Sequence, residues 1–99
     1  MMLGDDAHVT NLLVAPDMRR RGFARRILIG LIDSSLERGA KNLTLEVRSK
    51  NMPAISLYRR FGLSPIGSRP GYYGDDDALI MWVYDIDQEP YSNRLDGLR

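Results

Sequence analysis

Blocks of apolar residues along the chain predict a strand followed by a long helix. Leu12-Leu13-Val14-Ala15 is apolar at every position, as in a strand buried on both faces, and we expect that strand to span residues 8–15. Apolar side chains then recur at helical spacing from Phe23 to Leu36. This spacing predicts a helix over residues 20–38, which Gly39 ends.

The next two segments repeat this order. Residues 42–48 alternate apolar and polar side chains, which is typical of a strand with two different faces. Asn51 is a good N-cap for a second helix over residues 51–61, and Gly62 is a natural stop after it. A strand, a helix and a strand in this order predict two parallel strands joined by a right-handed crossover.

The last structured part is expected to be an antiparallel pair of strands at 63–69 and 78–84, joined by a turn-rich loop. Pro65 predicts a bulge or an edge position for the first of them. The order β-α-β-α-β-β therefore indicates an α/β fold with a mixed sheet. We expect the domain to occupy residues 1–86, with residues 1–7 as a loose lead-in. The polar tail, 87–99, is expected to be loosely attached or disordered.

Composition limits the classes of function. A chain of 99 residues makes one domain, and a net charge of +1 gives no general attraction to nucleic acid or to a membrane. The absence of cysteine excludes a disulfide framework and a cysteine nucleophile, and a single histidine argues against a metal site. No apolar run approaches the roughly 20 residues of a membrane span. We expect a cytoplasmic protein.

The turn between the first strand and the first helix concentrates positive charge. Five arginines gather there, at positions 19, 20, 21, 25 and 26. Free N–H groups at a helix start, the positive end of its dipole and guanidinium groups together suit a polyphosphate. Gly22 would let such a ligand approach the backbone. A solvated helix start and a nucleic-acid patch are the alternatives, although the near-neutral net charge argues against the patch. A P-loop would need Gly-Lys-Ser/Thr, which is absent.

Two residues that can move a proton are expected near this turn, because ligands bind beyond the carboxyl ends of parallel strands. Glu46 lies near the end of the strand 42–48, and Tyr58 shares a helix face with Asn51. Glutamate can take a proton and tyrosine can give one, as acyl transfer to an amine requires. A plain surface carboxylate and a core tyrosine are the alternatives for these two residues.

The order of these residues resembles a known family. Arg19-Arg20-Arg21-Gly22-Phe23-Ala24 matches the Arg/Gln-x-x-Gly-x-Gly/Ala signature of the GNAT family of N-acetyltransferases. Three later segments look like the protein N-terminal acetyltransferases of the ribosomal-protein-alanine (RimI) type. They are Leu45-Glu46-Val47-Arg48, Asn51-x-x-Ala54-x-x-Leu57-Tyr58-x-x-x-Gly62, and Tyr72-Tyr73 before Asp77-Ala78-Leu79-Ile80-Met81. The resemblance covers residues 8–86 and implies the C-terminal portion of the GNAT acyl-CoA N-acyltransferase fold.

The resemblance also implies an activity: transfer of the acetyl group of acetyl-CoA, without a metal, to the N-terminal α-amine of a protein, such as a ribosomal protein. Glu46 would be the general base, Tyr58 the general acid, and Tyr72 and Tyr73 would line the acceptor groove. Asn51 would bond the pantetheine arm. The implied cofactor-binding residues are Leu12, Leu13, Val14, Arg19, Arg20, Arg21, Gly22, Phe23, Ala24, Arg25 and Asn51.

The family domain carries further strands and helices before the part that corresponds to residue 8, and the sequence lacks them. The alternative function is therefore a truncated, non-catalytic acetyl-CoA-binding remnant, or a subunit that another chain completes. The strand at 8–15 would also expose an unpaired edge, which favours a homodimer. The acceptor protein, its first residue and an internal lysine as acceptor are left open.

Overall fold

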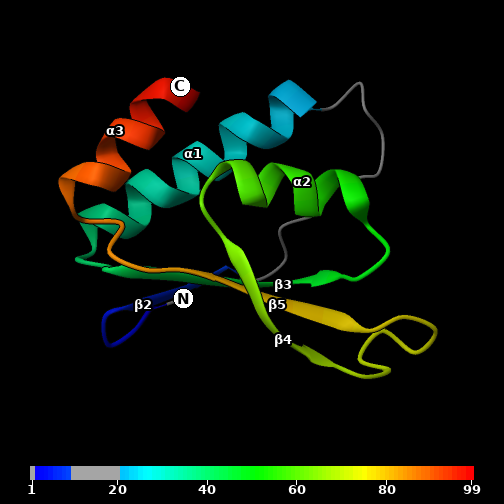
Figure 1. Cartoon of the computed structure of the whole chain (residues 1–99). Helices are drawn as coiled ribbons and strands as arrows, with labels where there is room; N and C mark the ends of the chain where they lie inside the picture. The colour runs from blue at the N-terminus through cyan, green and yellow to red at the C-terminus, as the bar shows by residue number, and fades with distance from the viewer. Residues whose placement is uncertain (1, 10–20) are drawn as a thin grey trace.

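The computed structural model describes residues 2–9 and 21–99, which form a mixed five-stranded sheet with three helices. The strand order is β1-β2-β3-β5-β4. The strands are β1 (Met2–Leu3), β2 (Asp6–Val9), β3 (Asn42–Arg48), β4 (Ser64–Arg69) and β5 (Ala78–Val83). The helices are α1 (Arg21–Glu37), α2 (Met52–Arg60) and α3 (Glu89–Leu98). All three helices lie on one face of the sheet (Figure 1).

The predicted parallel unit is confirmed. β2 and β3 pair in parallel, from Asp6 opposite Asn42 to Val9 opposite Leu45, and α1 connects them. Helix α1 buries Leu28 and Ile32 completely in the core, as its apolar spacing predicts. Gly39 follows the helix with a φ of +86°, a conformation that a residue without a Cβ adopts readily.

Helix α2 begins as the sequence predicts. The side-chain oxygen of Asn51 accepts a hydrogen bond from the backbone N–H of Ala54 at 3.3 Å, which satisfies one of the free donors of the first turn. Ile55, Tyr58 and Phe61 are buried, so the apolar stripe of this helix faces the core. Gly62 ends the segment with a φ of +87°. The cap and the stripe together fix where Tyr58 lies.

The antiparallel pair is also confirmed, together with both features predicted from Pro65. β4 is an edge strand, and its pairing with β5 shifts between Pro65 and Gly67. β5 lies between β4 and β3 and is antiparallel to both. Every residue of β4 is exposed, whereas Met81 of β5 is completely buried. A bulge is easily accommodated here, because β4 pairs with β5 on one side and has no strand on the other side in the described sheet.

The prediction of a loose lead-in is wrong. Met2–Leu3 form β1, which pairs antiparallel with Asp6 and Ala7 of β2 through a turn at Gly4, where φ is +63°. Strand β2 therefore begins before the predicted residue 8 and has a neighbour on that side. A two-residue strand carries too short a pattern for sequence analysis to recognise. Positions 10–15 of the predicted strand lie outside the described residues.

The prediction of a loosely attached tail is also wrong, because residues 89–98 form α3. Tyr91 and Leu95 are buried, one turn apart, and the Tyr91 hydroxyl donates a hydrogen bond to the Phe61 carbonyl at 2.7 Å. Arg99 donates to both carboxylate oxygens of Asp33 in α1, at 2.6 and 2.9 Å. The apolar positions of α3 are few, but Tyr91 and Leu95 are buried in the core and Leu98 packs against it. No helix in the described ranges is both long and apolar enough to cross a membrane.

Candidate active site

Glu46 lies on the face of the sheet opposite the helices, because it alternates in β3 with the buried residues Leu45 and Val47. Its side chain is nevertheless only 14% exposed. One carboxylate oxygen, Oε1, lies 3.6 Å from Nη2 of Arg69. The other, Oε2, is buried and has no hydrogen-bond partner among the described residues. A buried, unpartnered carboxylate oxygen is costly for the fold and is therefore a candidate for function.

Two aromatic residues and two arginines lie around Glu46. The guanidinium of Arg48 lies over the ring of Tyr73, 4.4 Å from its centroid, and the guanidinium of Arg69 lies 5.7 Å from the centroid of Tyr72. The two tyrosine rings meet edge to face, with centroids 5.0 Å apart. These contacts place both predicted acceptor-binding tyrosines beside the predicted base.

The loop that carries the tyrosines is held by two aspartates. The Asp76 carboxylate accepts hydrogen bonds from the Ser49 hydroxyl and from the backbone N–H groups of Lys50 and Asp77. The Asp77 carboxylate accepts from the backbone N–H of Gly71 at 2.8 Å. The bonds of Asp76 hold the pKa of its carboxyl below the usual range, with that of Ser49 the largest cause. The loop is therefore fixed to the segment that leads from β3 into α2.

Tyr58 is 2% exposed, and this burial raises the pKa of its hydroxyl well above the usual range, with the nearby Tyr73 adding to the rise. Burial likewise raises the pKa of Tyr73, and the carboxylate of Glu46 is the next largest cause. Tyr73 thus interacts electrostatically with both of the predicted catalytic residues. A raised pKa favours the neutral phenol of Tyr58, which is the form that its predicted role as a proton donor requires.

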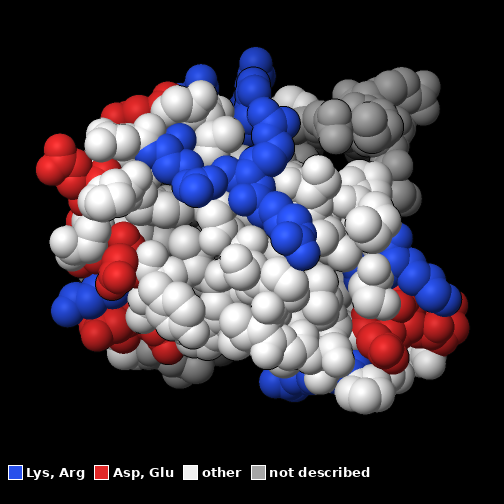
Figure 2. All heavy atoms as spheres, in the orientation of Figure 1, with Lys and Arg blue, Asp and Glu red and all other residues white. Residues whose placement is uncertain are grey.

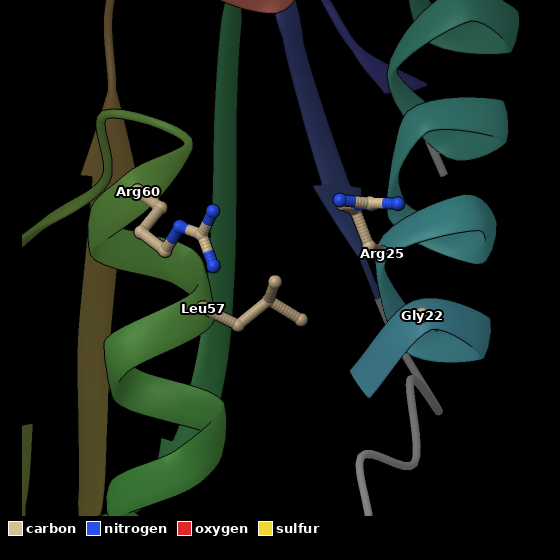
Figure 3. A pocket seen from close by; sticks show the side chains of 4 residues that line it. All are labelled: Gly22, Arg25, Leu57 and Arg60. Carbon is tan, nitrogen blue, oxygen red and sulfur yellow. The ribbon is translucent and has the colours of Figure 1, made fainter. Parts of the chain in front are cut away.

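A pocket of about 100 Å³ lies between the start of α1 and the end of α2. It is lined by Gly22 and Arg25 of α1 and by Leu57 and Arg60 of α2. Figure 3 shows the side chains of Arg25 and Arg60 reaching into the space between the two helices. Neither of these guanidinium groups pairs with a carboxylate in the part of the chain that the structure describes. The pocket is suited to an anion.

Further basic residues lie at the same end of α2. Arg59 and Arg60 end the helix, and Arg94 of α3 donates a hydrogen bond to the Arg60 carbonyl at 3.3 Å. Figure 2 shows a band of basic side chains across the helical part of the molecule, with the acidic side chains gathered toward its two sides. The near-neutral net charge of the chain therefore conceals a local positive surface.

The remaining predicted cofactor residues divide into three groups. Ala24 is buried, whereas Phe23 is 64% exposed at the start of α1, and Arg21 begins that helix. Asn51 caps α2, so its side-chain oxygen already serves the fold. The other predicted cofactor residues lie outside the described ranges: Leu12, Leu13, Val14, Arg19 and Arg20.

Sequence reasoning missed three residues of this site. Arg60 follows Tyr58 at a distance that carries no motif, and only the packing of α2 against α1 brings it to the pocket. Arg69 reaches Glu46 only through the pairing of β4 with β5. Asp76 stands in a run of three aspartates, and nothing in that run distinguishes the one that holds the loop. No cluster of three metal-ligating side chains occurs among the residues described.

The arrangement defines a class of protein: an α/β protein with an arginine-lined pocket between the start of α1 and the end of α2, and a buried glutamate and a buried tyrosine near one aromatic loop. Comparison with known proteins gives the family. Residues 3–63 match the model of the "Acetyltransferase (GNAT) family". The chain belongs to this family, and the mixed sheet with its helices has the fold of such acetyltransferases.

Individual proteins give a more specific likeness than the family model does. The chain is 43% identical over 81 residues to the [ribosomal protein bS18]-alanine N-acetyltransferase of Salmonella typhimurium, covering 78% of this chain and 55% of that protein. It is 36% identical over 85 residues to the protein of that name from Haemophilus ducreyi, covering 81% and 59%. The crystal structure of the ribosomal-protein-S18-alanine N-acetyltransferase from Escherichia coli superposes with a TM-score of 0.70 and 39% identity, over 84% of this chain and 56% of that one. The chain spans about half the length of the relatives it matches.

Proposed function

We propose that the chain transfers the acetyl group of acetyl-CoA to the N-terminal α-amine of a protein. The observation that carries this proposal is the Glu46 carboxylate. It is buried, holds one oxygen against Arg69 and leaves the other without a hydrogen-bond partner among the described residues. Such an oxygen can accept a proton from an incoming amine without first giving up a hydrogen bond. The family and the names of the relatives support the same reaction.

The pocket between α1 and α2 fits the phosphate end of acetyl-CoA. Two guanidinium groups without a described carboxylate partner, on Arg25 and Arg60, would bind phosphate oxygens, and Gly22 leaves the backbone of the first turn of α1 accessible. Acetyl-CoA supplies an acetyl group activated as a thioester. The sequence prediction that Asn51 bonds the pantetheine arm stays part of this proposal, with Leu12, Leu13 and Val14 alongside the arm.

Glu46 and Tyr58 would divide the proton transfers. A protein α-amine has a pKa near 8, so a large part is protonated at pH 7 and needs a base to become nucleophilic. Glu46 takes that proton, directly or through one water. The buried Tyr58 hydroxyl, whose raised pKa keeps it protonated, gives a proton to the departing thiolate. The nitrogen of a protonated amine loses two protons on the way to the amide. Glu46 takes the first and passes it to solvent, and the second, lost after attack on the thioester, replaces the proton that Tyr58 gives to the thiolate. No covalent enzyme intermediate is needed.

The acceptor would lie on the face of the sheet opposite the helices, which we call the open face. There Tyr72 and Tyr73 flank Glu46. The names of the relatives suggest the N-terminal alanine of a ribosomal protein as the acceptor. The cytoplasm, expected from the sequence, stays the proposed place of the reaction. The second candidate function is an acetyl-CoA-binding remnant, or a subunit that another chain or a second copy completes. It is favoured by one observation: the helices cover only one face of the sheet in the part of the chain that is described (Figure 1).

A thiol-release assay tests the proposal. The chain is incubated with acetyl-CoA and a peptide that begins with alanine, and calorimetry measures acetyl-CoA binding separately. We expect turnover in the wild type, loss of most of it in Glu46→Gln and Tyr58→Phe, and unchanged binding in both variants. Binding without turnover in the wild type would favour the remnant. Turnover that survives both substitutions would refute the roles of these two residues. An N-acetylated peptide serves as the control acceptor.

A further inference from the structure

The β-bulge in β4 decides which way Arg69 points. Ser64 stands opposite Trp82 and Pro65 opposite Met81, but Gly67, not Ile66, stands opposite Ile80. The bulge thus inserts one residue, and Arg69 then falls opposite Ala78. Because side chains alternate between the two faces of a sheet, one inserted residue moves every later side chain to the other face.

To reach Glu46, the side chain of Arg69 must point to the open face of the sheet. Ala78 pairs on its other side with Arg48, and Ile80 pairs with Glu46, so Arg69 shares a face with both residues of β3. Without the bulge, Ser68 would stand opposite Ala78 and Arg69 would point to the helical face. The ion pair between Arg69 and Glu46 is therefore a consequence of the bulge.

We propose that Arg69 is a positioning residue that holds Oε1 of Glu46 and thereby presents Oε2 to the acceptor amine; this inference rests on the proposed function. The contact of 3.6 Å joins Nη2 to Oε1, whereas Oε2 has no hydrogen-bond partner in the described ranges. Arg69 itself is held, because its guanidinium lies over the ring of Tyr72. A carboxylate on a flexible side chain would otherwise rotate, and both oxygens would exchange roles.

Kinetics of Arg69→Ala, Arg69→Lys and wild type test the inference. Loss of orientation costs turnover, so we expect kcat to fall on the order of tenfold or more in Arg69→Ala while KM for acetyl-CoA stays within about twofold. Arg69→Lys should recover a large part of kcat, and added guanidinium ion should partly rescue Arg69→Ala. Lys41→Ala is the matched control, because Lys41 and Asp5 form an ion pair away from the site, at 4.0 Å. Unchanged kcat in Arg69→Ala would overturn the inference.

A second readout does not depend on activity. The chain has three glutamates, Glu37, Glu46 and Glu89, so labelling with 13C-glutamate gives three carboxyl signals that Glu46→Gln assigns. We expect the Glu46 signal to move in Arg69→Ala, to return toward its position in Arg69→Lys, and to stay in Lys41→Ala. A Glu46 carboxyl signal that does not move in Arg69→Ala would overturn the inference. A wild type that binds acetyl-CoA without turnover would refute the proposed function instead, and the carboxyl signals would still decide whether Arg69 holds Glu46.

Discussion

The Ser49 hydroxyl donates a hydrogen bond to the carboxylate of Asp76, and this bond joins the two sides of the candidate site. Ser49 and Lys50 lie directly before Asn51, the cap of α2, and Asp76 lies in the loop that carries Tyr72 and Tyr73. The second carboxylate oxygen of Asp76 accepts from the backbone N–H of Lys50 at 3.3 Å. The helix that positions Tyr58 and the loop beside Glu46 are therefore tied together by one side chain.

Asp76→Asn should loosen this connection. An amide places an NH₂ group where one of the three donors now points, so at least one hydrogen bond is lost and one donor is left facing another. We expect the melting temperature to fall by several degrees and KM for the acceptor peptide to rise severalfold. Thermal unfolding and the thiol-release assay measure the two effects. Asp75→Asn is the control, because the Asp75 carboxylate accepts none of these three hydrogen bonds and, within the described residues, pairs with Arg48 at 3.5 Å. An equal effect there would contradict the prediction.

Arg60→Ala should weaken coenzyme A binding, because Arg60 lines the pocket between α1 and α2. An exposed guanidinium–phosphate contact is worth on the order of 1 kcal/mol, so we expect the Kd to rise about fivefold. Calorimetry with coenzyme A measures this, and repeating it with dephospho-coenzyme A shows whether the 3′-phosphate is the group that Arg60 binds. Arg59→Ala removes a charge from the neighbouring position, which is not among the lining residues, and should leave the Kd within about twofold. Equal losses of affinity in both variants would mean that the overall positive charge, and not a contact of Arg60, favours coenzyme A binding.

The elements whose pattern is complete in their own residues were predictable from the sequence. β3 alternates clearly, and α2 carries its own cap, Asn51, and its own stop, Gly62. α3 was missed because Pro90 and Gly97 weaken its pattern, and its stability comes from tertiary contacts such as that of Tyr91 with Phe61.

Some residues of the candidate site could likewise be predicted from the sequence, and others could not. Glu46 and Tyr58 could be singled out from their places on the predicted strand and helix. Tyr72 and Tyr73 could be singled out from the resemblance to a family, and the roles of all four residues stay predictions. Arg69 could not be found, since its partner depends on which face the bulge at Ile66 turns it to. A local proline indicates that a bulge is present, but not which later side chain it re-aims or what that side chain meets.

Gly62→Ala should destabilise the fold. Gly62 has a φ of +87°, which costs a residue with a Cβ about 1–2 kcal/mol. A Cβ at this position would also stand 3.3 Å from side-chain atoms of both Tyr91 and Val83, so α3 would have to give way. We expect a loss of about 2 kcal/mol in the free energy of unfolding, measured by urea denaturation. Gly30→Ala is the control, because it lies in a helix interior with nothing near its Cβ, and it should be neutral or stabilising.

Tyr91→Phe should change both the stability of the protein and its response to alkali. The Tyr91 hydroxyl donates to the buried Phe61 carbonyl at 2.7 Å, so its removal leaves that carbonyl unpaired and should cost about 1–2 kcal/mol near neutral pH. Burial raises the pKa of Tyr91 to about 12, whereas an unfolded tyrosine has a pKa near 10.

The sign of the pH effect follows from these two pKa values. Below pH 10 the Tyr91 phenol is neutral in both the folded and the unfolded state, and its full contribution to the free energy of unfolding is present. Between about pH 10 and 12 only the unfolded state ionises, so the free energy of unfolding falls as the pH rises, by about 1.4 kcal/mol for each unit of difference in pKa. Urea denaturation at pH 8, 10 and 11 should show a smaller alkaline loss in Tyr91→Phe than in the wild type. Some loss should persist, because burial also raises the pKa of Tyr58. Tyr84 is 58% exposed, so Tyr84→Phe should reproduce the wild-type slope, and an equal slope in Tyr91→Phe would refute the assignment.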